Sequence, residues 1–259
     1  MAEAAARAGG LAGRRDELVE RAAARPARRP FAAALRRSDV ALLTEIKRRS
    51  PSKGAINPTL DFPAFVRGYA SGGAAALSIL TQTSHFGGDV QDLAVASEVA
   101  SVPVLRKDFL VSPLQLLEAR AMGASAALLI ARAVPPTLLG ELFAAARELG
   151  LETLVEVRDE AELALAVDLG ATVIGVNTRD LETLAIDAAT GDRLLPQIPA
   201  SAVAVWESGV TSRTDVERAA RAGADAVLVG SSLSKSADPR AAVAALAGVP
   251  ARGRPVALA

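Results

Sequence analysis

Charged side chains follow several short apolar runs of this sequence, each at the point where the run ends. The clearest case is segment 103–109, PVLRKDF, where a predicted buried strand gives way to Lys107. In α/β proteins substrates bind at the carboxyl ends of strands, and a lysine held partly out of water there can have its pKa lowered toward neutrality. Lys107 is therefore a candidate proton donor, and the alternative is a surface lysine paired with Asp108.

Other predicted strands end on further acids, bases and amides. Glu45, Lys47, Glu156, Asn177 and Glu207 all occupy such positions. Converging acids and bases push one another's pKa values apart, so one site can offer both a general acid and a general base at neutral pH. A ring of purely structural salt bridges is the alternative.

Small residues follow the last two predicted strands. Ser208 and Gly209 come after the seventh strand, and Gly230 and Ser231 after the eighth. Backbone N–H groups can approach an anion there, and in barrels these two loops commonly bind phosphate. Lys47 follows the first strand, which neighbours the eighth in a closed barrel. The pattern predicts a phosphorylated small-molecule substrate.

Two loops suggest how a substrate is covered. Segment 47–54, KRRSPSKG, is basic and could fold over a bound anion, or it could be a solvated loop. Phe86 and Phe109 could clasp an aromatic ring, although either could equally belong to the core. We interpret His85, the single histidine, as a surface residue.

The positions of these residues depend on eight apolar runs that alternate with amphipathic segments. The predicted strands are 40–46, 75–80, 102–105, 126–130, 152–157, 172–176, 202–206 and 226–229. Helices are predicted near residues 65, 95, 116, 142, 163, 192, 216 and 243. This rhythm predicts a single (β/α)8 TIM barrel of the α/β class, with its active site at the carboxyl ends of the strands. A doubly wound open sheet competes, but its usual Gly-rich nucleotide fingerprints are missing.

The N-terminal residues have a different character. Residues 1–38 are rich in Ala and Arg, and Pro26 and Pro30 divide them. We predict a helical extension ahead of a barrel domain spanning 39–259. Leu18, Val19 and Ala22 fall at helical spacing there, which predicts an amphipathic helix that packs on the barrel. The first 13 residues are predicted to be disordered.

Composition excludes several classes of function. Among 259 residues, Lys plus Arg and Asp plus Glu both total 29, so no charge excess favours nucleic acid or an anionic membrane. There is no cysteine, which excludes disulfides and thiolate metal sites. The most apolar stretch, 122–134, is interrupted by Arg132 and is too short to span a bilayer. We expect a cytoplasmic protein without a metal site, either a monomer or a weak homo-oligomer.

Taken together, the motifs resemble the indole-3-glycerol-phosphate synthase family of tryptophan biosynthesis over about residues 40–248. The matching segments are EIK at 45–47 with SPSKG at 50–54, LRKDF at 105–109, LVEV at 154–157, GVN at 175–177, ESG at 207–209 and LVG at 228–230. The resemblance implies decarboxylating ring closure of 1-(2-carboxyphenylamino)-1-deoxyribulose 5-phosphate, without a cofactor. Lys107 resembles the family's general acid, and Glu156 the acid/base of the dehydration step.

The resemblance also implies roles for the neighbouring residues. Glu45 and Lys47 complete the charged set, which Asn177, Arg179 and Glu207 orient. The implied substrate contacts are Ser50, Gly209, Gly230 and Ser231 at the phosphate, Phe86, Phe109, Pro51, Leu128 and Leu181 at the aromatic ring, and Lys53 and Ser208 beside them. No site residue is carried over into residues 1–38.

Two residues depart from the family pattern, and two other functions compete. Thr178 stands where many members have a second asparagine, and Trp206 is a bulky residue that could point to the outer layer or the core and shift Glu207. A related isomerase, phosphoribosylanthranilate isomerase, uses a cysteine base, which this chain lacks. A catalytically silent phosphosugar-binding barrel would need the cations but not the acids beside Lys107.

Overall fold

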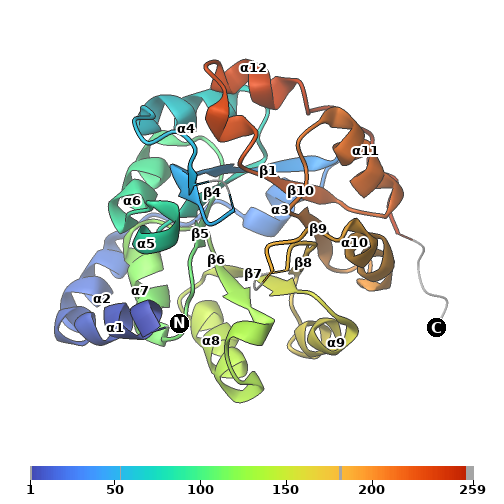
Figure 1. The fold of residues 1–259 in the computed structure, drawn as a ribbon. Helices are drawn as coiled ribbons and strands as arrows, with labels where there is room; N and C mark the ends of the chain where they lie inside the picture. Colours follow the sequence, from blue (N-terminus) through green and yellow to red (C-terminus); the bar gives the residue numbers. More distant parts are fainter. Residues whose placement is uncertain (1, 53, 181–182, 255–259) are drawn as a thin grey trace.

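Eight parallel strands form a closed barrel in the computed structural model, which describes residues 2–52, 54–180 and 183–254 (Figure 1). The strand order around the barrel is β1-β10-β9-β8-β7-β6-β5-β4. The bounds are β1 (Ala41–Ile46), β4 (Ala76–Leu80), β5 (Val104–Lys107), β6 (Ala126–Ile130), β7 (Glu152–Val157), β8 (Val173–Asn177), β9 (Val203–Glu207) and β10 (Ala226–Val229). The predicted (β/α)8 barrel is therefore confirmed.

Helices follow the strands and surround the barrel (Figure 1). They are α4 (Phe62–Ser71), α6 (Val90–Val99), α7 (Pro113–Ala121), α8 (Pro136–Glu148), α9 (Glu160–Asp168), α10 (Ala188–Leu194), α11 (Arg213–Arg221) and α12 (Pro239–Ala244). Local sequence explains their ends: the Ser112 side chain caps α7, while Gly123 adopts a positive φ of 88° just after it. Among the described residues, no helix is long and apolar enough to cross a membrane.

Alternation along the strands sorts their side chains into two layers. In β1, Ala41 and Leu43 belong to the cluster inside the barrel, whereas Leu42 belongs to the cluster beneath the helices. Glu45 therefore shares the inward side with Leu43. The same parity turns the following residues inward at the ends of their strands: Lys107, Glu156, Asn177, Glu207 and Gly230.

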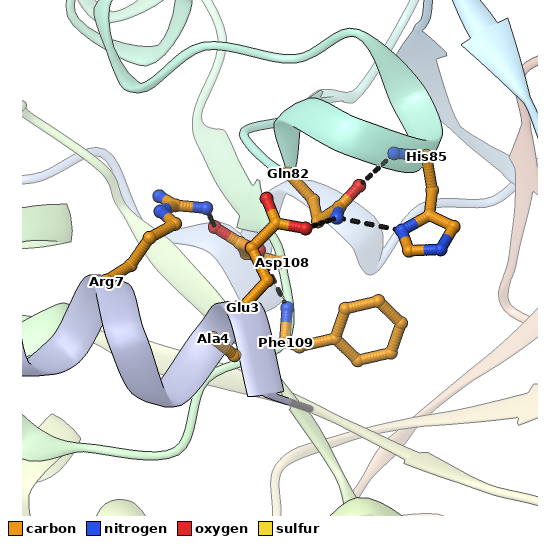
Figure 2. Close-up of a pocket in the computed structure, with 7 residues that line it drawn as sticks. All are labelled: Glu3, Ala4, Arg7, Gln82, His85, Asp108 and Phe109. Atoms are coloured by element: carbon orange, nitrogen blue, oxygen red, sulfur yellow. Dashed lines mark hydrogen bonds and ion pairs between the residues drawn. The ribbon is translucent and has the colours of Figure 1, made fainter.

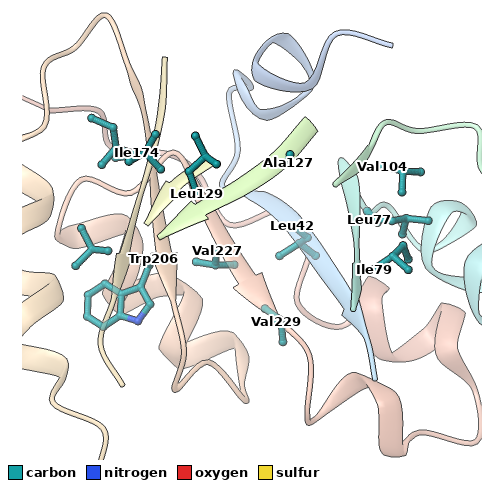
Figure 3. Packing of buried hydrophobic residues seen from close by; sticks show 14 of the residues in the cluster. Leu42, Leu77, Ile79, Val104, Ala127, Leu129, Ile174, Trp206, Val227 and Val229 are labelled. Carbon is teal, nitrogen blue, oxygen red and sulfur yellow. The ribbon is translucent and has the colours of Figure 1, made fainter. Parts of the chain in front are cut away.

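Outward-facing residues pack between the strands and the helices (Figure 3). Trp206 belongs to this layer, since it alternates with the inward Val205 and Glu207. A Cβ on Gly191 of α10 would lie only 2.5 Å from the indole ring, so the glycine makes room for the tryptophan. The indole therefore occupies the outer layer, one of the two positions that the sequence left open.

The segment before β1 contains α1 (Ala2–Gly10), a 3-10 turn at Ala12–Arg14, α2 (Arg15–Ala24) and α3 (Phe31–Leu35). Leu18 and Ala22 of α2 pack against Leu117 and Ala121 of α7, which confirms the predicted amphipathic helix. Val19, also expected on this face, is 43% exposed instead. α3 contributes to the cluster inside the barrel and covers its amino-terminal end. The prediction of disorder was wrong for residues 2–13, because α1 and the turn after it are ordered and Ala4 and Leu11 are buried; residue 1 lies outside the described residues.

Candidate active site

The predicted charged residues meet at the carboxyl ends of the strands. A cavity of about 290 Å³ is lined by Glu45, Lys47, Lys107, Asn177, Arg179, Glu207, Ser208, Gly209, Gly230 and Ser231. Glu156, on β7, lines a smaller cavity that adjoins this one and shares Lys107 and Asn177 with it. Because a closed parallel barrel brings all its strand ends to one face, residues more than 150 positions apart become neighbours.

Lys107 lies between two buried carboxylates. Its Nζ is 3.6 Å from Glu156 Oε2 and 3.9 Å from Glu207 Oε2. Burial disfavours the ammonium, but three nearby carboxylates, led by Glu156, outweigh this effect and raise the pKa of Lys107 above its ordinary value. The predicted lowering of this pKa was therefore wrong. Lys107 remains a cation at neutral pH and can donate a proton only to an atom that becomes strongly basic.

The alternative pairing of Lys107 with Asp108 is also wrong, because the two side chains face opposite sides of β5. Asp108 pairs with Arg106 at 3.3 Å, on the outer side. Arg106 is fully buried and also pairs with Glu118 of α7 at 2.9 Å. This outer network joins β5 to α7 and leaves Lys107 free to face the mouth.

Glu207 is a buried acid with a raised pKa. Burial, followed by repulsion from Glu156, raises its pKa well above the usual range, and the attraction of Lys107 only partly opposes this. The carboxyl group occupies space that a side chain at position 175 would fill, since a Cβ on Gly175 would lie 1.9 Å from Glu207 Oε1. Glu207 Oε1 and Glu156 Oε2 are buried without a hydrogen-bond partner. Glu156 Oε2 faces the Lys107 ammonium, whereas Glu207 Oε1 lies against Gly175.

Asn177 connects the acids of β7 with the loop after β9. Its Nδ2 donates to Glu156 Oε1 at 3.1 Å, and its Oδ1 accepts from Ser208 Oγ at 2.9 Å and from the Arg179 backbone N–H at 3.0 Å. The Arg179 guanidinium donates to the Leu184 carbonyl at 2.8 Å, and burial lowers its pKa. Asn177 therefore fixes the orientation of Glu156.

Glu45 and Lys47 form an ion pair at the end of β1. Ser234, which follows β10, donates to the Glu45 carbonyl and accepts from the Lys47 backbone N–H, both at 3.2 Å. Lys47 lies beside Gly230, because a Cβ at that position would be 2.7 Å from Lys47 Cε. As predicted from the closed order of strands, the first and last strands thus bring a cation to the small-residue loops.

The loop after β9 has an unusual backbone. Ser208 and Gly209 both adopt a positive φ, 72° and 77°, a conformation that is uncommon for serine. Thr178 Oγ1 donates to the Glu207 carbonyl at 3.0 Å, and Trp206 Nε1 donates to the Ser208 carbonyl at 3.0 Å. Thr178 and Trp206 therefore hold this loop in place.

A second cavity, of about 490 Å³, adjoins the charged residues of the mouth. Polar and apolar side chains line it together: Lys47, Ser50, Pro51, Ser52, His85, Phe86, Phe109, Arg179, Leu184 and Ser231. We call it the apolar cavity after its wall of Pro51, Phe86, Phe109 and Leu184. Ser50 Oγ is buried there without a partner. Leu128 borders a smaller adjoining space together with Phe86 and Phe109. Lys53 and Leu181 lie outside the described residues.

Sequence reasoning did not single out several residues of this face. Gly175 appeared only as part of the GVN segment, without a role, and Ser234 was missed. Each acts through a neighbour, the first by leaving space and the second by two backbone contacts. Ile186 borders the charged cavity from the loop after β8. Gly175 precedes Asn177 by two residues on β8, so the alternation along the strand could have placed it on the inward side. Within the described part of the chain, no group of three or more His, Asp or Glu side chains could hold a metal ion.

Comparisons with known proteins agree with this geometry. A family model described as indole-3-glycerol phosphate synthase matches residues 5–246, a range that begins within α1 rather than near residue 40. An indole-3-glycerol phosphate synthase of Streptomyces griseus is 48% identical over 89% of this chain and 86% of the relative. Indole-3-glycerol phosphate synthase 1 of Streptomyces coelicolor is 50% identical, with the same coverage.

A solved structure supports the fold independently. The 3-hexulose-6-phosphate synthase of Salmonella typhimurium superposes with a TM-score of 0.62 at 16% identity, over 80% of this chain and 96% of that chain. At so low an identity the likeness concerns the fold alone. The family model and the curated relatives show that the chain belongs to the indole-3-glycerol phosphate synthase family.

Proposed function

We propose that the charged residues at the mouth of this barrel carry out the family's reaction. Lys107 is the acid and Glu156 the acid/base, and Glu45, Lys47 and Glu207 complete the set. As a member of the family, the protein is a decarboxylating lyase of tryptophan biosynthesis. The reaction closes 1-(2-carboxyphenylamino)-1-deoxyribulose 5-phosphate to indole-3-glycerol phosphate and releases carbon dioxide and water.

The two sides of the mouth suit the two ends of this substrate. Gly209, Gly230 and Ser231 offer an open backbone beside the Lys47 ammonium, as a phosphate requires. Phe86 and Phe109 line the apolar cavity, which we assign to the aromatic ring. Arg179 borders both cavities and has no carboxylate partner within the described residues, so it can meet the ring's carboxylate.

Ring closure needs an acid at the ketone oxygen. As the aromatic carbon attacks the ketone carbon, this oxygen becomes an alkoxide, which is basic enough to take a proton from an ammonium of raised pKa. Loss of carbon dioxide then restores the aromatic ring, and loss of the new hydroxyl as water completes the indole. Glu156 is the acid/base of this last step, with Asn177 orienting its carboxylate.

One observation carries this proposal: Lys107 faces both Glu156 and Glu207 at the mouth that also holds the small-residue loops. A silent phosphosugar-binding barrel would have no use for two buried acids with unpartnered oxygens. The test is a fluorescence assay for indole formation from the carboxyphenylamino substrate with the purified protein. Formation of indole-3-glycerol phosphate with one carbon dioxide per turnover supports the proposal, and tight binding without product would favour the silent barrel.

The remaining predictions concern the molecule's state and location. A division at residue 38, a cytoplasmic location and a monomeric or weakly associating state belong to this proposal. Sedimentation velocity on the purified chain tests the oligomeric state.

A further inference from the structure

One face of α1 is directed at residues that follow β4 and β5 (Figure 2). Glu3, Ala4 and Arg7 recur at helical spacing on α1, and Ala4 and Leu11, the residue just after α1, are 6% and 7% exposed. Arg7 Nη1 donates to Asp108 Oδ2 at 2.9 Å and to the Thr81 carbonyl at 3.2 Å. α1 is thereby attached to the residues that follow β4 and β5.

Glu3 makes a second attachment one helical turn away. It accepts a hydrogen bond from Gln82 Nε2 at 2.6 Å and another from Ser84 Oγ. Gln82 in turn contacts His85 Nδ1 at 2.9 Å. These residues, with Arg7, Asp108 and Phe109, border a cavity of about 220 Å³ (Figure 2). Since its polar groups bond with one another, we interpret this cavity as the seam between α1 and the barrel rather than as a ligand site.

Arg7 completes the charge balance of a buried cluster. Asp108 and Glu118 are both buried carboxylates that share the single guanidinium of Arg106. Arg7 supplies the second positive charge, and the Asp108 side chain it meets is 1% exposed. Without Arg7, two buried negative charges would depend on one cation.

Asp108 also contacts the backbone of Phe109. Its Oδ1 accepts the Phe109 backbone N–H at 2.9 Å, while Oδ2 accepts from Thr81 Oγ1 at 2.5 Å. The Phe109 side chain borders both the seam under α1 and the larger apolar cavity. The carboxylate that Arg7 holds therefore fixes the backbone from which this aromatic wall projects.

We propose that Arg7 is a positioning residue for the aromatic side of the site, acting through Asp108 on Phe109. This inference rests on the proposed function, because it assigns the apolar cavity to the substrate's aromatic ring. Arg7 contacts neither Glu156 nor Glu207, which hold the Lys107 ammonium from β7 and β9. Its loss should therefore weaken binding of the aromatic ring and leave the chemical step intact.

The experiment compares Arg7→Met with Arg14→Met, which removes an exposed arginine paired with Glu17. We would measure kcat and KM for the carboxyphenylamino substrate, and by calorimetry the Kd of 2-aminobenzoate and of inorganic phosphate. For Arg7→Met, KM and the 2-aminobenzoate Kd should rise about 3- to 10-fold. The value of kcat and the phosphate Kd should stay within about 2-fold, as should every value for Arg14→Met. Arg7→Lys keeps a cationic donor and should restore part of the affinity.

Three results would overturn the inference. Arg7→Met could lower only the melting temperature, which would make Arg7 a mere anchor of α1. Arg7→Met could also raise the phosphate Kd, or lower kcat, by the same factor as it raises the 2-aminobenzoate Kd. Finally, the wild-type protein could fail to bind 2-aminobenzoate. If Arg7→Met does not fold, Arg7→Lys serves the same comparison, with unchanged affinity as the contradicting result. An inactive wild-type protein would defeat the proposed function, whereas the 2-aminobenzoate comparison would still test Arg7.

Discussion

Glu207 shows how burial sets the charge of a single residue in this site. Its raised pKa means that the folded protein holds this proton more tightly than the unfolded chain does. The resulting stabilisation is fully present below the ordinary value of 4.5 and is lost as the pH rises through the raised pKa. Glu207 is therefore an acid whose ionisation costs stability at neutral pH.

Replacing Glu207 with glutamine should reveal this cost. The amide cannot ionise, so the free energy of unfolding of Glu207→Gln should increase relative to wild type between pH 5 and pH 8, by about 1.4 kcal/mol for each pH unit in this range that lies below the raised wild-type pKa. Urea denaturation at both pH values measures the difference. The exposed Glu217→Gln is the control, and a difference that did not change with pH would show that Glu207 titrates normally.

Gly230 is a residue whose lack of a side chain matters. A Cβ there would lie 2.7 Å from both Glu45 Oε1 and Lys47 Cε, and an aspartate would add a negative charge where we place the phosphate. Gly230→Asp should weaken binding of inorganic phosphate by at least about 10-fold, measured by calorimetry. Gly140→Asp, on α8, is the control. Unchanged phosphate affinity would place the phosphate elsewhere.

At the level of elements, β5 carries charge on both of its sides. Lys107 faces the mouth, while the fully buried Arg106 joins Asp108 to Glu118 of α7. Arg106→Leu would leave two buried carboxylates without their shared cation and should lower the free energy of unfolding by about 3–5 kcal/mol. The exposed Arg14→Met should cost less than about 1 kcal/mol. Equal losses in urea denaturation would contradict the cluster's structural role.

Strand periodicity explains why so much of this site was predictable. Each apolar run ended on a residue in register with the inner core, so Glu45, Lys107 and Glu156 had to meet once the strands closed. Trp206 could have been placed by the same alternation, since it precedes the inward Glu207. The register of the strands and the closure of the barrel were therefore enough to predict most of the charged residues of the site.

Features that depend on contacts between distant segments were not predictable. The lysine pKa was predicted in the wrong direction, because three acids from separate strands outweigh burial. The order of α1 was missed because its buried face is short and includes Glu3 and Arg7, which read as exposed charges until their partners are known. Neither feature is local in the sequence.

At the scale of the whole molecule, both the residues that the family model matches and the packing of the helices before β1 link the N-terminal segment to the barrel. The family model begins at residue 5, and α1, α2 and α3 each bury side chains against the barrel. The helices before β1 therefore pack on the barrel, with α3 at its amino-terminal end and α1 beside its mouth.

The most direct test of the account is the steady-state rate of indole formation by Lys107→Met. Methionine keeps the aliphatic stem but removes the donor that stabilises charge on the ketone oxygen only in the transition state. We predict that kcat falls by at least about 10²-fold while KM changes much less. Lys107→Arg should not restore the rate, because a guanidinium does not give up its proton. Near-normal turnover by either variant would contradict the assignment of Lys107 as the acid.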